Sequence, residues 1–172
     1  MPRENIDAVV AHAGLDRFHL SMFSRGTAYG LAYALDVADR VRSISVGDYV
    51  GGELGIPGGV WAPQFVQGRW RGTPVLERAR EVALAGVARE SVERRYYDQL
   101  RELAKPMLVV RSGVVLAGGH SFVNAEEQAA YREAGAEIIT FDDSPHDLFR
   151  NDPTRYPELV ADLAARAEAR DG

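Results

Sequence analysis

The stretch "FHLSMFSRGTAYGLAYALD" (Phe18–Asp36) decides the fold of this chain. It opens with a short apolar run, Phe18–Phe23, which is typical of a strand. It continues into small residues with apolar positions at helical spacing, which predicts a helix over residues 25–38. One serine, Ser24, stands between the two. Serine is a favoured residue at a helix start, and it is also a potential nucleophile when a sharp turn holds it.

The rest of the chain alternates predicted helices and strands around this stretch. We predict further strands over residues 41–47, 106–112 and 137–143, and helices over residues 5–13, 125–135 and 157–170. Asn124 precedes the acidic first turn "AEE" and is the predicted N-cap of its helix. Strands that alternate with helices over short connections predict an α/β fold with a mostly parallel sheet and flanking helices.

An insertion interrupts this alternation between residues 49 and 105. It begins with "YVGGELGIPGGVWAPQFVQGRWRG", which is rich in glycine, proline and aromatic residues, and it continues into a predicted helical pair over residues 74–88 and 89–103. A connection of this length often forms a lid or a binding loop, although a plain helical insertion that covers the sheet is the simpler interpretation. We therefore expect one domain over residues 1–172, with its core in 1–48 and 106–172 and a helical cap insertion in about 49–105.

Composition excludes several classes of protein. The 172 residues include no cysteine, which excludes disulfides, a thiol nucleophile and thiolate metal sites. The net charge is -5, with 20 basic and 25 acidic residues mixed along the chain, which argues against nucleic-acid binding. No stretch approaches the roughly 18 apolar residues of a membrane span, and the N-terminus is polar, without the apolar core of a signal peptide. We expect a cytoplasmic protein with neither nucleic acid nor membrane as a partner.

The residues around Ser24 fit a strand–serine–helix turn in part. Such a turn is tight, so the residues two before and two after the serine should be small, and the backbone N–H groups at the helix start can stabilise an oxyanion. Gly26 meets this requirement, whereas Met22 stands where glycine is usual. The motif alone is weak, and a helix N-cap explains the serine equally simply.

A serine nucleophile needs a histidine base, and two of the four histidines have suitable positions. His12 falls inside a predicted helix and His19 inside a predicted strand. His120 and His146 each follow a predicted strand, on the side of a parallel sheet where sites form. His146, in "FDDSPHDLF" directly after the last strand, is the stronger candidate.

The acid that would orient this histidine has two candidate positions. Asp48 directly follows the strand after the serine helix and is the favoured residue. The loop after "PMLVVRS" holds no aspartate, and its nearest acids, Glu126 and Glu127, fall at a predicted helix start where a carboxylate is common. The sequence leaves the choice between Asp48 and Glu126 open.

Together these stretches resemble the α/β-hydrolase superfamily. The resemblance rests on "LDRFHLSMFSRGTAYGLAYALDVADRVRSISVGD", "KPMLVVRSG" and "AEIITFDDSPHDLFRNDPTRYPELVADL", and on the order serine, acid, histidine. It implies a serine hydrolase with Ser24 as nucleophile, His146 as base and Asp48 as orienting acid, acting on an ester, thioester or related acyl bond of a small molecule. It also implies the backbone N–H of Arg25 as an oxyanion donor, no cofactor and no metal. Aromatic residues of the insertion would line an apolar substrate pocket: Tyr49, Trp61, Phe65 and Trp70.

The chain departs from the superfamily's pattern in its first part. It starts at the helix before Phe18, so the early strands, and the loop that supplies the second oxyanion donor, have no counterpart. We therefore expect Phe18–Phe23 at an edge of the sheet, open to a second copy or a completing chain. An alternative function follows: an inactive or incomplete hydrolase fragment that serves as a binding or structural module. A third reading keeps the fold with the chemistry of a cofactor-free haloperoxidase or lyase.

Overall fold

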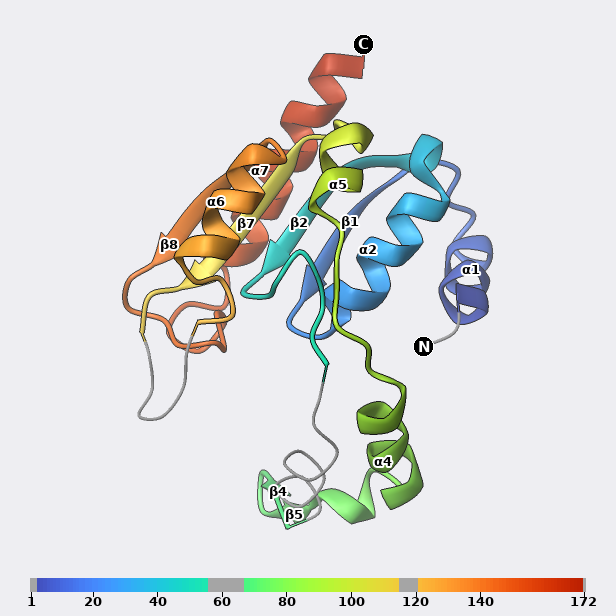
Figure 1. Ribbon diagram of the computed structural model, residues 1–172, viewed down its shortest axis with the longest axis vertical. Coiled ribbons are helices and arrows are strands. Elements are labelled where there is room, and N and C mark those ends of the chain that lie inside the picture. The colour runs from blue at the N-terminus through green and yellow to red at the C-terminus, as the bar shows by residue number, and fades with distance from the viewer. Residues whose placement is uncertain (1–2, 56–66, 115–120, 172) are drawn as a thin grey trace. The chain divides into compact units, whose positions relative to one another are not determined.

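A computed structural model describes residues 3–55, 67–114 and 121–171 of the chain (Figure 1). Its central sheet has four parallel strands in the order β1-β2-β7-β8, with β1 at one edge as predicted. The strands are β1 (Phe18–Phe23), β2 (Val41–Gly47), β7 (Met107–Ser112) and β8 (Ala136–Phe141). The central strands β2 and β7 are buried along almost their whole length, while the edge strands are partly exposed, as expected for a parallel sheet covered on both faces.

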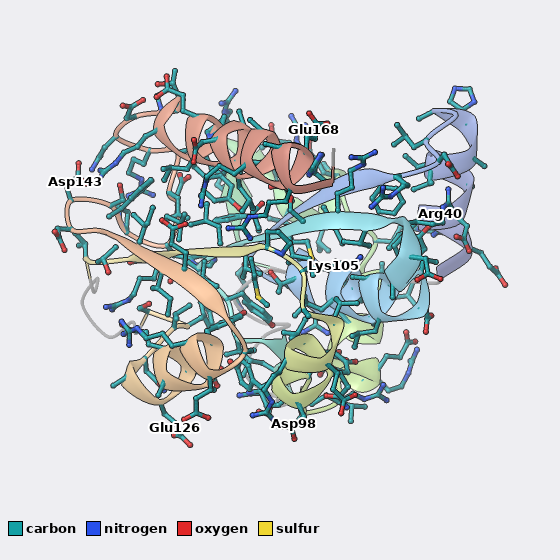
Figure 2. The ribbon with its side chains drawn as sticks, turned by 90° about the horizontal axis from the view of Figure 1, so that it is seen from above. Arg40, Asp98, Lys105, Glu126, Asp143 and Glu168 are labelled. Atoms are coloured by element: carbon teal, nitrogen blue, oxygen red, sulfur yellow. The ribbon has the colours of Figure 1, made fainter. Side chains whose placement is uncertain are left out.

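Helices cover both faces of this sheet, so the predicted α/β class is confirmed. Seen from above, α7 (Arg155–Asp171) lies on one face, and α2 (Gly26–Asp36), α5 (Tyr97–Leu103) and α6 (Ala125–Glu133) lie on the other (Figure 2). The first helix, α1 (Arg3–His12), is tied to α2 by a hydrogen bond from the Tyr33 hydroxyl to Asp7, 2.9 Å long. A short 3₁₀ helix leads from α2 into β2. None of the helices in the described ranges is long and apolar enough to cross a membrane.

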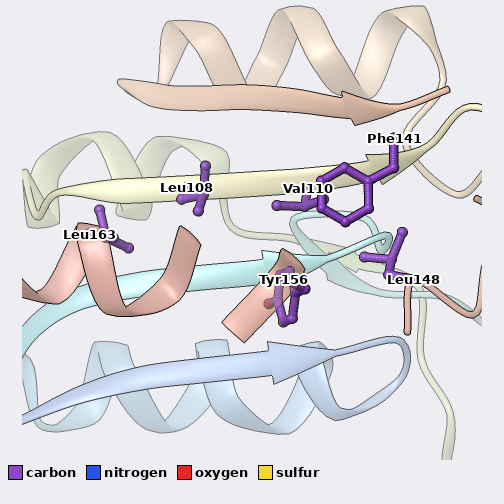
Figure 3. Packing of buried hydrophobic residues seen from close by; sticks show 6 residues of the cluster. All are labelled: Leu108, Val110, Phe141, Leu148, Tyr156 and Leu163. Carbon is purple, nitrogen blue, oxygen red and sulfur yellow. The ribbon is translucent and has the colours of Figure 1, made fainter. Parts of the chain in front are cut away.

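Apolar side chains between the sheet and α7 form one continuous cluster (Figure 3). On α7, the apolar positions Tyr156, Leu159, Val160 and Leu163 recur at helical spacing and face this cluster. Burial of each large side chain of this kind stabilises the fold by about 1.5–3 kcal/mol. The buried members of the cluster are Leu108, Val110, Phe141, Leu148, Tyr156 and Leu163.

The chain divides into two compact units, of which the second comprises Glu53–Arg94. Within it, β4 (Arg69–Trp70) and β5 (Thr73–Pro74) form an antiparallel pair, and α4 (Glu81–Glu90) follows a 3₁₀ turn. At the two ends of this unit, β3 (Gly52–Glu53) pairs with β6 (Arg94–Arg95). The expectation that an insertion here serves as a cap remains a prediction.

The predicted bounds of the helical pair in the insertion were wrong. Pro74 adopts an extended conformation (ψ 139°) in β5, and Val75 N–H donates to the Gly68 carbonyl at 2.9 Å, so the hairpin takes up residues expected to be helical. The chain also extends after Ser91 and enters β6 before α5 begins. Backbone pairing therefore overrides the local helical pattern on both sides of α4.

Met22 is accommodated by a glycine of the helix that packs over it. Its side chain is buried against α2, and a Cβ added at Gly30 would lie 2.6 Å from Met22 Cγ and closer still to its Sδ. The large residue before the Ser24 turn therefore fits because the helix carries no side chain at the contact. At Gly26, by contrast, an added Cβ would meet no atom of the described residues within 4 Å. The contacts of the described residues therefore do not require a small side chain at this position.

This packing predicts a compensating pair of substitutions. Gly30→Ala should destabilise the protein by about 1–3 kcal/mol because of overpacking, and Met22→Ala by about 2–5 kcal/mol because of the cavity it leaves. In the double variant the methyl group added on the helix occupies part of that cavity, so the loss should fall short of the sum by at least about 1 kcal/mol. Urea unfolding of the four proteins measures the coupling. Losses that add to within about 0.5 kcal/mol would show that the two sites do not compete for space.

Asp152 stabilises the start of α7 by hydrogen bonding. Its Oδ1 accepts from Thr154 N at 2.9 Å, from Thr154 Oγ1 at 2.8 Å and from Arg155 N at 3.3 Å. These bonds, led by the Thr154 backbone N–H, lower the pKa of Asp152 below its ordinary value of 3.8. A carboxyl group with a lowered pKa stabilises the folded state above its unfolded-state pKa, and this contribution disappears as the pH falls through the folded-state pKa.

Asp152→Ala should therefore lower the unfolding midpoint at pH 7 and have a smaller effect below pH 3.8, as the wild-type carboxylate becomes protonated. Thermal unfolding of both proteins over a pH series measures the difference. A gap between the two that stayed constant across that range would mean that the charge of Asp152 contributes nothing.

Candidate active site

The sheet's hydrogen bonds bring Ser24 and Asp48 side by side at the carboxyl edge. Phe23 pairs with Gly47, and the pattern continues one residue further, because Ser24 N–H donates to the Gly47 carbonyl at 2.9 Å. In the same way Asp48 N–H donates to the Val110 carbonyl at 2.8 Å. Each residue is therefore fixed by the backbone of the neighbouring strand, at the edge where parallel sheets hold their sites.

Both residues adopt a backbone conformation that side chains disfavour. The φ angle is 52° at Ser24 and 41° at Asp48, in the left-handed region. Such a conformation costs on the order of 1–3 kcal/mol and persists where the surrounding structure enforces it. At Ser24 the positive φ turns the chain sharply from β1 into α2, whose first turn begins with Thr27 N–H donating to the Ser24 carbonyl at 2.9 Å.

The loop after β8 carries His146 to the same edge. A turn closes directly after the strand, with Ser144 N–H donating to the Phe141 carbonyl at 3.1 Å, and the fully buried Leu148 anchors the far side of the loop in the core. His146 then lies between the other two residues: its Nδ1 is 2.8 Å from Asp48 Oδ2, and its Nε2 is 2.8 Å from Ser24 Oγ.

Charge determines which way these hydrogen bonds run. The side chain of Asp48 is fully buried, whereas that of His146 is 37% exposed. An ionised carboxylate accepts hydrogen bonds only, so Nδ1 of His146 donates to Asp48, and the neutral ring is left with Nε2 as an acceptor for the Ser24 hydroxyl. The arrangement can therefore take a proton from Ser24 and stabilise the resulting imidazolium against the buried carboxylate.

Two phenylalanine rings fix the plane of His146. The Phe23 ring stacks on the imidazole with centroids 5.1 Å apart, and the Phe122 ring meets it edge-on at 4.9 Å. Phe149 in turn packs edge-on against Phe23 at 5.5 Å. Phe122 is 37% exposed and Phe149 is 36% exposed, so the apolar side chains around the histidine are themselves partly in contact with solvent.

The segment after Asp48 is held by tyrosines from α5 and α6. Tyr131 donates to the Tyr49 carbonyl at 3.0 Å, and Gly51 N–H donates to the Tyr97 hydroxyl at 2.9 Å. The Tyr97 hydroxyl donates in turn to the Glu127 carboxylate. Burial, together with that carboxylate, raises the pKa of Tyr97 well above its ordinary value, which keeps the hydroxyl protonated as a donor. These contacts fix the backbone that follows the strained Asp48.

The other predicted site residues have different surroundings. Arg25 directly precedes α2, at the end of the helix that points its backbone N–H groups towards Ser24. Tyr49 is buried and packs on Phe122 with centroids 5.3 Å apart. The alternative acid, Glu126, is exposed in the first turn of α6 and has no hydrogen bond to His146 among the bonds of the described residues. Trp70 belongs to β4. Trp61, Phe65 and His120 lie outside the described residues.

Sequence reasoning missed two groups that contact Asp48 and two that contact His146, of which one is the Phe23 ring described above. Ser112 N–H and the Ser121 hydroxyl both donate to Asp48 Oδ1, and Phe122 packs on the imidazole. The available signal was position: Ser112 ends the strand next to β2, and Ser121 and Phe122 follow that strand at the same sheet edge as the predicted site. No sequence pattern indicated that the side chains of Ser121 and Phe122 point towards Asp48 and His146.

No protein-family model and no curated protein matches this sequence. Solved structures match it by fold. An α/β hydrolase enzyme from a Medee basin deep-sea metagenome library aligns with a TM-score of 0.65 and 14% identity, over 95% of this chain and 70% of that one. A probable hydrolytic enzyme from Pseudomonas aeruginosa PAO1 gives 0.61 and 15%, over 94% and 67%. The enol-lactonase from Burkholderia xenovorans LB400 gives 0.59 and 16%, over 95% and 71%. The chain therefore has the α/β-hydrolase fold.

Proposed function

We propose that this protein is a serine hydrolase that cleaves an ester, thioester or related acyl bond with Ser24 as the nucleophile. The observation that carries the proposal is the pair of 2.8 Å hydrogen bonds that join Ser24 Oγ, the imidazole of His146 and the buried carboxylate of Asp48. A serine hydroxyl is a poor nucleophile on its own, and a base oriented by a third group is what activates it.

The reaction then has two steps. Ser24 Oγ attacks the acyl carbon as His146 Nε2 takes its proton, and the backbone N–H of Arg25 donates to the oxyanion that forms. The imidazolium returns the proton to the leaving alcohol or thiol, which departs and leaves an acyl–serine ester. Water, activated by His146 in the same way, attacks this ester, and the carboxylic acid and free Ser24 result.

The fold and the surroundings of His146 support this choice of chemistry. Solved structures of the same fold include enzymes named as hydrolases and an enol-lactonase. The partly exposed rings of Phe122 and Phe149 give the site an apolar rim, which suits an apolar acyl or alcohol group better than a charged one. We also propose that the insertion serves as a cap and that its aromatic residues contact the substrate: Tyr49, Trp61, Phe65 and Trp70.

One observation favours the alternative of a non-catalytic module completed by a partner. The strand that precedes Ser24, β1, is the edge strand of the described sheet, and an unpaired edge can accept a further strand from another chain. In that case the contacts of Ser24 and His146 would be structural, and the chain would bind no acyl substrate covalently.

The first test is Ser24→Ala. The variant should lose ester hydrolysis by at least about 10³-fold on a short p-nitrophenyl ester, because the acyl-enzyme cannot form. A fluorophosphonate probe should label the wild-type protein and not the variant. Activity near the wild-type level in the variant would refute the nucleophile assignment, and a folded wild-type protein that takes up no probe would favour the non-catalytic module.

The second test separates the two candidate acids. Asp48→Asn keeps the size of the side chain but removes its charge, so kcat should fall by about 10³- to 10⁴-fold, whereas Glu126→Gln should leave kcat within about twofold. Both variants are compared on the same ester, with far-UV circular dichroism as the check of folding. A large loss in the Glu126 variant with a small loss in the Asp48 variant would reverse the assignment.

A further inference from the structure

Asp48 has two carboxylate oxygens with separate partners. Oδ2 contacts His146, whereas Oδ1 accepts from Ser112 N–H at 3.0 Å and from Ser121 Oγ at 2.8 Å. The Ser112 donor is a backbone group at the end of β7, so any residue other than proline would supply it there. The Ser121 donor is a side-chain hydroxyl, so a substitution at position 121 can remove it.

The local geometry aims the Ser121 hydroxyl proton at Asp48. Val123 N–H donates to Ser121 Oγ at 3.2 Å and thereby uses one of its lone pairs. The competing acceptor for the hydroxyl proton, the Val123 carbonyl, is 3.5 Å away, at the limit of a hydrogen bond, whereas Asp48 Oδ1 is at 2.8 Å and carries charge. The hydroxyl therefore donates to the carboxylate.

The start of α6 holds Ser121 in place. Val123 is fully buried, and the next residue, Asn124, caps the helix by accepting from Glu127 N–H at 2.9 Å. Between Ser121 and Val123, the ring of Phe122 packs on the imidazole of His146. One short segment before α6 thus contacts both Asp48, through a hydroxyl, and His146, through a ring.

We propose that Ser121 is a positioning residue of the hydrolytic site, acting through Asp48; this inference rests on the proposed hydrolase function. A carboxylate bound at Oδ2 alone can rotate about its Cβ–Cγ bond. Two donors on Oδ1 stop that rotation and keep Oδ2 directed at His146 Nδ1. Ser121 touches neither the reacting atoms nor the substrate, and its effect reaches the reaction only by holding the orientation of the imidazole.

Kinetics of Ser121 variants test the proposal. Ser121→Ala should lower kcat about 10-fold with KM unchanged within about twofold, since a hydrogen bond to a charged group contributes about this much and Ser112 N–H still holds Oδ1. Ser121→Thr, which keeps the hydroxyl, should stay within about threefold of wild type. The matched control is Ser43→Ala: Ser43 is also a buried serine, with a 2.8 Å hydrogen bond to a histidine, His19, at the opposite end of β2 from Asp48. It should leave kcat unchanged.

A spectroscopic readout tests the same point without turnover. The proton between His146 Nδ1 and Asp48 should give a low-field proton NMR resonance that is absent from Asp48→Asn. In Ser121→Ala this resonance should shift and broaden as the carboxylate gains freedom and water exchanges, and in Ser121→Thr and Ser43→Ala it should remain. If Ser121→Ala does not fold, Ser121→Cys, which nearly conserves volume but supplies only a weak donor, takes its place.

The outcomes separate this proposal from the proposed function. A folded Ser121→Ala or Ser121→Cys protein with wild-type kcat and an unchanged resonance would overturn the role of Ser121. An equal loss of kcat in Ser43→Ala would overturn it too, because the effect would then belong to any buried serine. If the wild-type protein hydrolyses no ester, the proposed function fails, and the resonance still decides whether Ser121 orients Asp48.

Discussion

The backbone hydrogen bonds that continue the parallel sheet past the ends of its strands are the constraint on which this site depends. Ser24 N–H bonds to β2 and Asp48 N–H bonds to β7, one residue beyond each strand. With these bonds fixed, the chain must turn at once into the next segment, and both residues take a positive φ. The strain is local, and the packed sheet that enforces it is a much larger source of stability.

The buried charge of Asp48 organises the second half of the site. A carboxylate that is fully removed from water must have hydrogen-bond donors, and it finds them in Ser112, Ser121 and His146, from three different segments. The connection after β7 contributes one of these donors, the Ser121 hydroxyl, to a carboxylate that lies at the end of the neighbouring strand β2. The same carboxylate fixes the tautomer of His146, so the requirement to compensate a buried charge also decides that an unprotonated Nε2 faces the Ser24 hydroxyl.

Much of the fold could be predicted from the sequence, because hydrophobic periodicity reports burial and parallel strands align their carboxyl ends. The four strands and the meeting of Ser24, Asp48 and His146 at one edge follow from these two rules, whereas the edge position of β1 was expected from the resemblance to a known fold. Local patterns failed on both sides of α4, over residues 74–80 and 91–96, where the end of a hairpin, a 3₁₀ turn and the pairing of β6 with the distant β3 stand in place of the predicted helices. They also failed for side-chain direction: Ser121 gives no signal of its own in "GGHSFVN", and only the structure shows that its hydroxyl donates to Asp48.

Met22 shows that a sequence motif can stand for a packing requirement that other residues are able to meet. The turn needs room where α2 crosses the end of β1, and a glycine two residues before the serine is one way to provide it. Here the room is provided from the opposite side, by Gly30 on the helix, and the strand keeps a large apolar residue that adds buried surface. The sequence motif around Ser24 is therefore incomplete, because Met22 replaces its first glycine, but the space that the turn needs is present. The glycine that provides this space faces β1 from α2, six residues after Ser24 in the sequence.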